Sequence, residues 1–273
     1  MDNHIDEIEF TIFDTETTGL EPQQGDRIIE IAAIKFKKDK ILGNFESLIN
    51  PLRHIPKTTQ NINHITDEMV RNAPTIDKII PSFLEFIQGS YLCAYNASFD
   101  FVFLQNELKL INLNLLKDTI VVDLLKMSKR LLPGLPRYAL RFVAENLGIK
   151  TENLHRAFAD VMISFEIFKK LKNILLSKGI CDVDNFSHLF ALNGTYIDNL
   201  NYQKMAKIQE AIDIGVKLKI KYLSHKNALI SERKVIPKEI RHEGQQIYLV
   251  GYCLLRNQER TFSLDGILHL EII

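Results

Sequence analysis

The sequence predicts an α/β fold in which a mixed sheet is flanked by helices and followed by a small β-rich domain. Residues 8–49 are patterned as strands, and from residue 66 to residue 176 helical patterns alternate with short apolar strands. Beyond residue 205 the chain is patterned as a helix and several short strands joined by polar turns. A length of 273 residues, of which 46% are hydrophobic, is enough for two cores.

The first 50 residues predict three neighbouring strands. In the segment IEFTIFD, the alternating residues Ile8, Phe10 and Ile12 share one face of a strand. RIIEIAAIKF and ILGNFESLIN follow, and the short polar link KKDK between them favours antiparallel pairing. Residues 66–88 then predict short helices that end at Gly89.

The remainder of the first part repeats a strand-then-helix order. The predicted strands are YLCAYN and VVDLL, and the predicted helices are SFDFVFLQNELKL, RYALRFVAENLG and residues 155–176. The segment after Ser177 is rich in Asn, Asp and Gly, which is typical of a connector. We therefore predict a first domain over residues 1–177, a connector over 178–205 and a β-rich domain over 206–273.

Charge and cysteine content restrict the function classes. The 34 Lys+Arg balance the 34 Asp+Glu, so the chain lacks the strong basic excess of many nucleic-acid-binding proteins, and any such contact must be local. The three cysteines form no C-x-x-C pair and predict core thiols in a reducing compartment. An acidic N-terminal segment and the lack of an apolar run of about 18 residues predict a cytoplasmic protein without a membrane partner.

The segment FDTETTGL predicts two neighbouring carboxylates. Because the side-chain period of a strand is two, Asp14 and Glu16 project from the same side near the strand end. Adjacent carboxylates repel each other unless a cation lies between them, and divalent cations prefer oxygen ligands. A solvated acidic strand end is the alternative interpretation.

Two further acidic positions follow apolar segments. In YNASFD, Asp100 falls in the first turn of a helix, where a carboxylate is also favourable as a simple surface feature. In HRAFAD, residues five apart cannot share a helical face, so we place His155 on the preceding loop and Asp160 within the helix. A carboxylate in an apolar helix needs compensation, either from a metal ion or from a salt bridge.

These acidic residues and His155 occur in an order that resembles the DEDDh 3′–5′ exonucleases, the superfamily that includes the proofreading epsilon subunit of DNA polymerase III. FDTETTGL, AYNASFD and HRAFAD are similar to the three exonuclease motifs of that family. RIIEIAAIKF, NHITDEMV and LPRYALRFVAENLGI are similar to the connecting segments. The resemblance covers roughly residues 8–176.

The resemblance implies a ribonuclease H-like fold and hydrolysis of terminal phosphodiester bonds with two Mg²⁺ or Mn²⁺ ions. Asp14, Glu16 and Asp160 would hold the first ion. Asp14 would bridge to the second ion, which Asp100 would reach directly or through water. His155 would be the general base, since an unperturbed pKa of about 6.5 suits proton removal near neutrality.

The resemblance also implies substrate contacts. Thr17 and Leu20 would cradle the terminal nucleotide through backbone groups and an apolar wedge, and Ile65 and Phe99 would line the same pocket. Each of these four is equally compatible with ordinary packing. His64 stands where relatives often have glycine and is given no catalytic role.

A basic run and the tail offer further contacts. The run is a candidate track for backbone phosphates or a solvated helical surface, and it consists of Lys126, Lys129, Arg130, Arg137, Arg141 and Lys150. The tail resembles a WYL domain through AIDIGVKLKIKYLS, VIPKEI and IYLVGYCLLRNQERTFSLDGI, with Ile247 in place of the name-giving Trp. Ser263 and Gly266 occupy places where relatives often carry arginines.

The WYL resemblance implies a possible nucleotide or nucleic-acid ligand, for which Tyr222, Arg256 and Arg260 are the candidate contacts. An accessory or dimerising domain is the alternative. For the whole chain we expect a metal-dependent 3′–5′ exonuclease that acts on single-stranded or frayed 3′ ends of DNA and releases nucleoside monophosphates. The alternatives are an exoribonuclease, a nucleic-acid or nucleotide sensor that uses the tail, and a polymerase proofreading partner.

Overall fold

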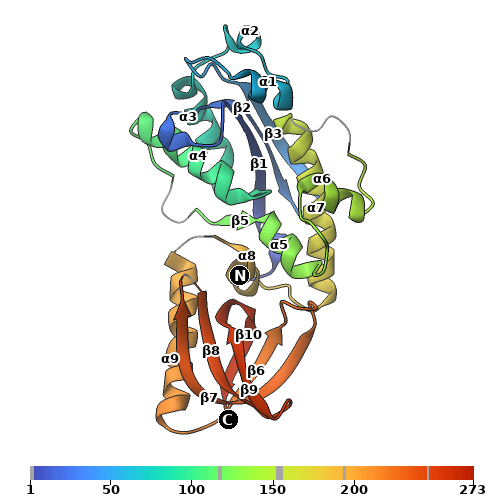
Figure 1. Cartoon of the computed structure of the whole chain (residues 1–273), viewed down its shortest axis with the longest axis vertical. Helices are drawn as coiled ribbons and strands as arrows, with labels where there is room; N and C mark the ends of the chain where they lie inside the picture. Colours follow the sequence, from blue (N-terminus) through green and yellow to red (C-terminus); the bar gives the residue numbers. More distant parts are fainter. Residues whose placement is uncertain (1–2, 116–118, 152–155, 193–194, 245) are drawn as a thin grey trace.

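The computed structural model describes residues 3–115, 119–151, 156–192, 195–244 and 246–273. Two units follow each other along the long axis of the molecule (Figure 1). The first is a sheet with helices on both faces, and the second is an antiparallel sheet with one long helix beside it. The predicted α/β class and the separate β-rich domain are therefore confirmed.

The first sheet is mixed and has the strand order β3-β2-β1-β4-β5. β1 pairs antiparallel with β2, and β2 with β3, as the short links predict, whereas β4 and β5 join in parallel. The strands are β1 (Glu9–Thr17), β2 (Ile28–Lys37), β3 (Lys40–Leu48), β4 (Tyr91–Ala94) and β5 (Val121–Asp123).

Both faces of this sheet are buried. Along β1, Phe10 and Ile12 belong to one core cluster and Phe13 to a second one, because alternate side chains point to opposite faces. Ile8 packs against the first cluster, as its spacing predicts. Helices α3 (Ile76–Ile87) and α4 (Ala97–Leu110) supply the second cluster, and the helices of residues 124–190 supply the first.

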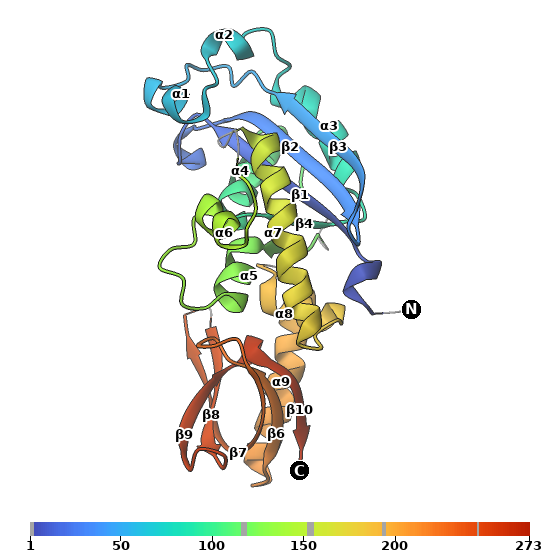
Figure 2. The same ribbon diagram turned by 90° about the vertical axis from the view of Figure 1, so that its right-hand side faces the viewer.

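The helices of this unit are α1 (Lys57–Asn63), α2 (Asp67–Val70), α3 (Ile76–Ile87), α4 (Ala97–Leu110), α5 (Leu124–Leu131), α6 (Leu140–Asn146) and α7 (Ala157–Ser177). After the opening three-stranded meander, α1 to α3 precede β4, α4 lies between β4 and β5, and α5 to α7 follow β5. Figure 2 shows α7 lying along the sheet, where it contacts β1 and β2. Short 3-10 helices occur at Ile5–Glu7, Pro22–Gln24 and Leu264–Gly266.

The predicted connector contains more helix than its composition suggests. Helix α8 (Val183–Phe190) places Phe186 and Phe190 in the first core cluster. After α8, the backbone N–H of Leu192 donates to the carbonyl of Val121 at 2.8 Å, which adds the connector to the edge of β5. Helix α9 (Thr195–Asp213) begins within the predicted connector and continues to the tail.

The second sheet is antiparallel throughout, with the order β10-β6-β7-β8-β9. Its strands are β6 (Leu218–Leu223), β7 (Ile230–Glu243), β8 (Gln246–Cys253), β9 (Gln258–Ser263) and β10 (Ile267–Ile272). One face packs against α9 around a core that includes Ile208, Ile220 and Leu249. Figure 2 shows this sheet curving beside α9.

Candidate active site

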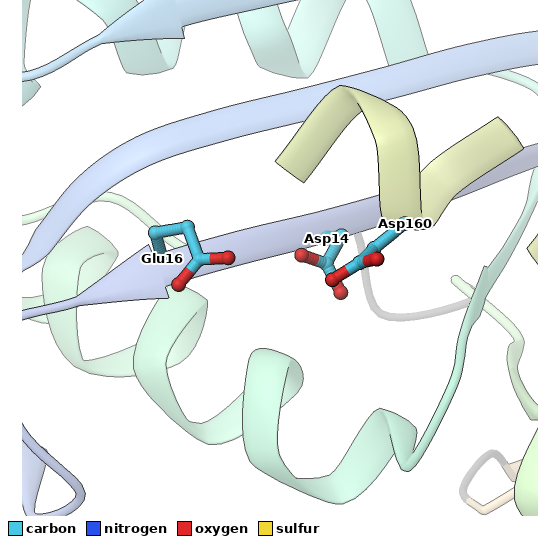
Figure 3. A group of neighbouring side chains, drawn as sticks. All are labelled: Asp14, Glu16 and Asp160. Carbon is cyan, nitrogen blue, oxygen red and sulfur yellow. The ribbon is translucent and has the colours of Figure 1, made fainter. Parts of the chain in front are cut away.

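Two carboxylates lie near the C-terminal end of β1. Asp14 and Glu16 are partly exposed, whereas Thr15 between them is buried. Figure 3 shows both carboxylates along the strand, with Asp14 facing α7. The two residues therefore share one side of the sheet, as the D-x-E spacing predicts.

Asp160 brings a third carboxylate to the same place. It lies in the first turn of α7 and is only 8% exposed. One carboxylate oxygen from each of Asp14, Glu16 and Asp160 lies within 4.8 Å of the other two. In Figure 3, Asp160 points from the helix toward Asp14 on the strand. Three oxygen donors at this spacing suit a divalent cation.

Asp100 approaches from a different element. It is buried in the first turn of α4, and its Oδ1 accepts hydrogen bonds from the backbone N–H of Thr15 at 2.9 Å and from the Thr15 hydroxyl at 2.7 Å. Asp100 is thus tied to the residue between Asp14 and Glu16. It is not a member of the three-carboxylate group, so its contact with an ion stays a prediction.

The carboxyl groups have raised pKa values. Burial, together with the charges of Asp160 and Glu30, raises the pKa of Glu16 to about 8. Burial also raises the pKa of Asp100 to about 7, against the opposing effect of its hydrogen bonds from Thr15. The pKa of Asp14 lies well above its usual range because of burial and the neighbouring carboxylates. Buried like charges favour protonation or a bound cation.

A divalent metal ion fits this set of donors. The side chains are carboxylates from two elements, they are close together and mostly shielded from water, and each disfavours the charge of the others. A bound cation would offset the repulsion among these carboxylates. Mg²⁺ and Mn²⁺ are suitable cations because they prefer oxygen ligands.

Two residues of the site were missed by sequence reasoning. Glu30 lies on β2 directly opposite Glu16 and is 1% exposed. Asn63 is buried at the end of α1, and its side chain lowers the pKa of Glu16 through a hydrogen bond. Glu30 carried a detectable signal, because it is the single charge inside the apolar segment IIEIAAI. Asn63 carried none.

The general base predicted at His155 lies outside the described residues. The next residue, Arg156, is the N-cap of α7 and forms an ion pair with Glu30. The ion pair therefore holds Arg156, the residue directly after His155 in the sequence, in place.

The predicted substrate contacts lie in different environments. The Thr17 hydroxyl donates to the carbonyl of Gly19 at 2.6 Å, and Leu20 is 78% exposed just beyond β1. Phe99 is half-buried and packs on Phe103 with ring centroids 4.9 Å apart. Ile65 is fully buried in a core cluster with Ile29, Ile55 and Val70, so its side chain contacts other apolar residues rather than solvent.

His64 adopts a left-handed backbone conformation with φ 59° at the end of α1. Glycine adopts this conformation with the least strain.

The candidate ligand contacts of the tail lie on β6, on β9 and in the turn between β8 and β9. Arg256 and Arg260 are exposed, while Tyr222 is half-buried and packs edge-on against Phe262 with ring centroids 5.2 Å apart. The space beside Gly266 is taken by Arg130 of α5, whose Nη2 would lie 2.9 Å from a Cβ at that position. Within the described part of the chain, no helix is both long and apolar enough to cross a membrane.

Comparison with protein families supports two assignments. Residues 11–168 match the model of a family described as "Exonuclease", and residues 203–272 match that of the WYL domain. The chain is 43% identical over 163 residues to the DNA polymerase III subunit epsilon of Treponema pallidum, a match that spans 59% of this chain and 75% of the relative.

Other relatives are much longer. The chain is 33% identical over 267 residues to the PolC-type DNA polymerase III of Clostridium perfringens, covering 94% of this chain but only 18% of that polymerase. Among solved structures, an E. coli ExoI–ssDNA complex in its zinc-bound form aligns with a TM-score of 0.60, 16% identity, and coverage of 89% of this chain and 54% of ExoI. The nuclease domain of 3′hExo, a DEDDh family member bound to rAMP, aligns with a TM-score of 0.54, 18% identity, and coverage of 63% of this chain and 93% of that domain. These likenesses support the fold.

Proposed function

This chain belongs to the exonuclease family and carries a WYL domain, and from that premise we propose that it is a 3′–5′ exonuclease that degrades single-stranded or frayed 3′ ends of DNA. The products would be nucleoside monophosphates. The observation that carries the proposal is the group of three carboxylates on β1 and α7. The match to a DNA polymerase subunit over three quarters of its length supports DNA as the substrate.

The family depends on divalent metal, and we propose two Mg²⁺ or Mn²⁺ ions as the cofactor. Asp14, Glu16 and Asp160 would hold one ion. Asp14 would also contact the second, which Asp100 would reach directly or through water. When bound, the ions supply positive charge to the phosphate oxygens and acidify the attacking water.

The residues around the carboxylates would position them. Thr15 holds Asp100 with two hydrogen bonds, and Glu30 fixes the start of α7 through Arg156, one helical turn before Asp160. His155, adjacent to Arg156, would accept the proton of the attacking water. By fixing the carboxylates and the base, these residues would hold the reacting groups at the chain end in one orientation.

The terminal nucleotide would lie beyond the end of β1. Leu20 has the exposure that an apolar wedge against a base requires, and Thr17 holds the loop before it. Phe99 would contribute the side of the pocket, and Ile65 would support it from the core. In the tail, Tyr222, Arg256 and Arg260 remain the proposed contacts for a nucleotide or nucleic-acid ligand.

A substrate panel tests the proposal. The purified chain is incubated with Mg²⁺ and 3′-labelled single-stranded DNA, blunt duplex DNA or RNA, and the release of labelled mononucleotide is measured. We expect rapid release from single-stranded DNA, slower release from duplex DNA, and no release by Asp14→Asn. Preferential release from RNA would replace DNA by RNA as the substrate, and release of oligonucleotides would contradict an action from the 3′ end.

A further inference from the structure

A cleft lies between the two units of the chain, away from the three carboxylates. It has a volume of about 370 Å³, within the range of small-molecule pockets. The exonuclease unit contributes α5 and its flanks, and the tail contributes the turn after β6 and the start of β8. The lining residues are Asp123, Leu125, Lys126, Lys129, Arg130, Leu189, His225 and Gln246. α5 follows the edge strand β5, whereas the carboxylates lie on β1 and α7.

Three cationic side chains enter this cleft from one helix. Lys126, Lys129 and Arg130 are separated by three and four residues and therefore share a face of α5. The acidic lining residue, Asp123, caps the same helix by accepting the Leu125 N–H at 2.8 Å. It also accepts the Ala97 N–H at 3.4 Å. Because backbone donors already solvate this carboxylate, it neutralises the three cations only in part.

Arg130 has hydrogen-bonding capacity left. It is 4% exposed, and its Nε and Nη2 atoms are buried without a hydrogen-bond partner among the described residues. Its Nη1 contacts the ring of His225, and Nη2 lies 3.8 Å from Asp265 Oδ1, which is beyond hydrogen-bond distance. Buried guanidinium donors without acceptors are unfavourable, so an anion in the cleft would stabilise this side chain.

The other ionisable side chains of the cleft differ in burial and in charge. Burial and the nearby charge of Arg130 lower the pKa of Lys126. Lys129 is exposed at the mouth of the cleft. His225 faces Arg130, and burial together with that charge lowers its pKa, so it is a neutral polar group at pH 7. Asp265 Oδ1 lies 3.5 Å from the neutral His225 and 3.8 Å from Arg130 Nη2, so it balances part of the charge of Arg130.

We propose that this cleft binds a small phosphate-bearing anion of nucleotide size, held by Lys126, Lys129 and Arg130. Lysine and arginine are the side chains that pair with phosphate oxygens, and Arg130 offers two donors on one guanidinium. Leu125 supplies apolar surface for the remainder of the ligand, and Gln246 supplies an amide. The site uses residues from both units, so its occupancy would couple the tail to the exonuclease unit.

Calorimetric titration of the full chain with dAMP tests this site. EDTA is included so that no divalent ion supports phosphate binding at the carboxylates. We expect dAMP and inorganic phosphate to bind and deoxyadenosine not to bind. Lys129→Ala should weaken dAMP binding about tenfold, because it removes one charge-assisted hydrogen bond. Its matched control is Lys40→Ala, an exposed lysine on β3 at the opposite edge of the sheet, which should bind dAMP like the wild type.

The choice of Lys129 keeps the test independent of folding. Arg130→Met removes more of the proposed site but also changes the packing between the units, whereas Lys129 is exposed. Equal dAMP affinities for Lys129→Ala and Lys40→Ala would overturn the proposal, as would tight binding of deoxyadenosine or the absence of any dAMP binding. Mononucleotide release with Mg²⁺ is measured on the same variants, so failure of the exonuclease proposal is seen separately.

Discussion

Arg156 and Glu30 join the start of α7 to β2. Arg156 Nη2 lies 2.6 Å from Glu30 Oε1, Arg156 Nε lies 3.1 and 3.2 Å from the two oxygens, and the Ala157 N–H donates to Glu30 Oε2 at 2.9 Å. The same carboxylate therefore pairs with a cation and caps a helix. Because Asp160 lies four residues after Arg156, this contact sets where its carboxylate meets Asp14.

Removing Arg156 should destabilise the protein more than removing the charge of Glu30. Glu30 is 1% exposed and would keep an uncompensated charge beside Glu16, whereas the side chain of Arg156 is 40% exposed and can be hydrated. We expect Arg156→Met to lower the free energy of unfolding by about 2–3 kcal/mol. We expect Glu30→Gln to lower it by about 1 kcal/mol, because the amide oxygen can still cap α7.

Urea unfolding measures both changes. The control is Arg141→Met, which removes an exposed pair with Glu145 and should change stability by about 0.5 kcal/mol or less. Equal effects of Arg156→Met and Arg141→Met would mean that the ion pair between Arg156 and the buried Glu30 does not stabilise α7.

Without divalent metal, stability should fall as the pH rises. The pKa of Glu16 rises from 4.5 to about 8 in the folded chain, and that of Asp100 from 3.8 to about 7. Between these limits the folded state binds more protons than the unfolded state, so the free energy of unfolding decreases with increasing pH. Urea unfolding in EDTA between about pH 5 and about pH 8 measures this slope.

Saturating Mg²⁺ should flatten that profile, because the ion and the protons compensate the same charges. A matched measurement on Glu16→Gln should also give a flatter profile in EDTA. A profile that rises with pH in the metal-free wild type would contradict the raised pKa values.

Asp14→Asn should stabilise the metal-free protein while abolishing its activity. The substitution removes a charge that Asp100, Asp160 and Glu16 all disfavour. We expect a gain of about 1 kcal/mol at pH 8 in EDTA. Mononucleotide release should fall by more than the roughly 10- to 100-fold typical of losing an outer-sphere partner of a metal site.

Asp198→Asn, at an exposed position of α9, serves as the control for this substitution and should change neither property. A loss of stability in Asp14→Asn would show that the carboxylate is structural.

Leu20→Ala should impair the reaction without affecting the fold. Leu20 is 78% exposed, so its removal should change stability by about 0.5 kcal/mol or less. If its side chain wedges against the terminal base, KM for single-stranded DNA rises or kcat falls. Steady-state kinetics give kcat and KM for Leu20→Ala. The control is Leu255→Ala, the same substitution at a tail residue that is 60% exposed. Identical kinetics would remove Leu20 from the substrate site.

Much of the fold and the carboxylates could be predicted because the signals are local. The two-residue period of β1 places Asp14 and Glu16 together, and the apolar spacing in residues 155–176 predicts α7. The antiparallel order of β1, β2 and β3 follows from their short links. Family resemblance then joined Asp100 and Asp160 to this pair, which neither spacing nor composition could do.

Contacts between distant segments could not be predicted in the same way. Arg130 belongs to a basic run that predicts a phosphate track or a solvated helical surface, but it is buried at the junction and faces Gly266 in the tail. Arg141 of the same run pairs with Glu145, and Arg137 lies over the ring of Phe142. The order of charges in the sequence does not show in which direction each side chain points. That direction depends on how the parts of the chain pack together.

The hydrogen bond from the Leu192 N–H to the Val121 carbonyl covers the β5 edge of the first sheet. An outermost strand offers unpaired backbone groups to which a strand of another molecule can add, which leads to aggregation. The residues after α8 take that position on β5. A fragment that ends at Ser177 lacks this cover and exposes the apolar surface under Phe186 and Phe190, so we expect it to self-associate in light scattering, whereas a fragment that ends at Leu192 should stay monodisperse.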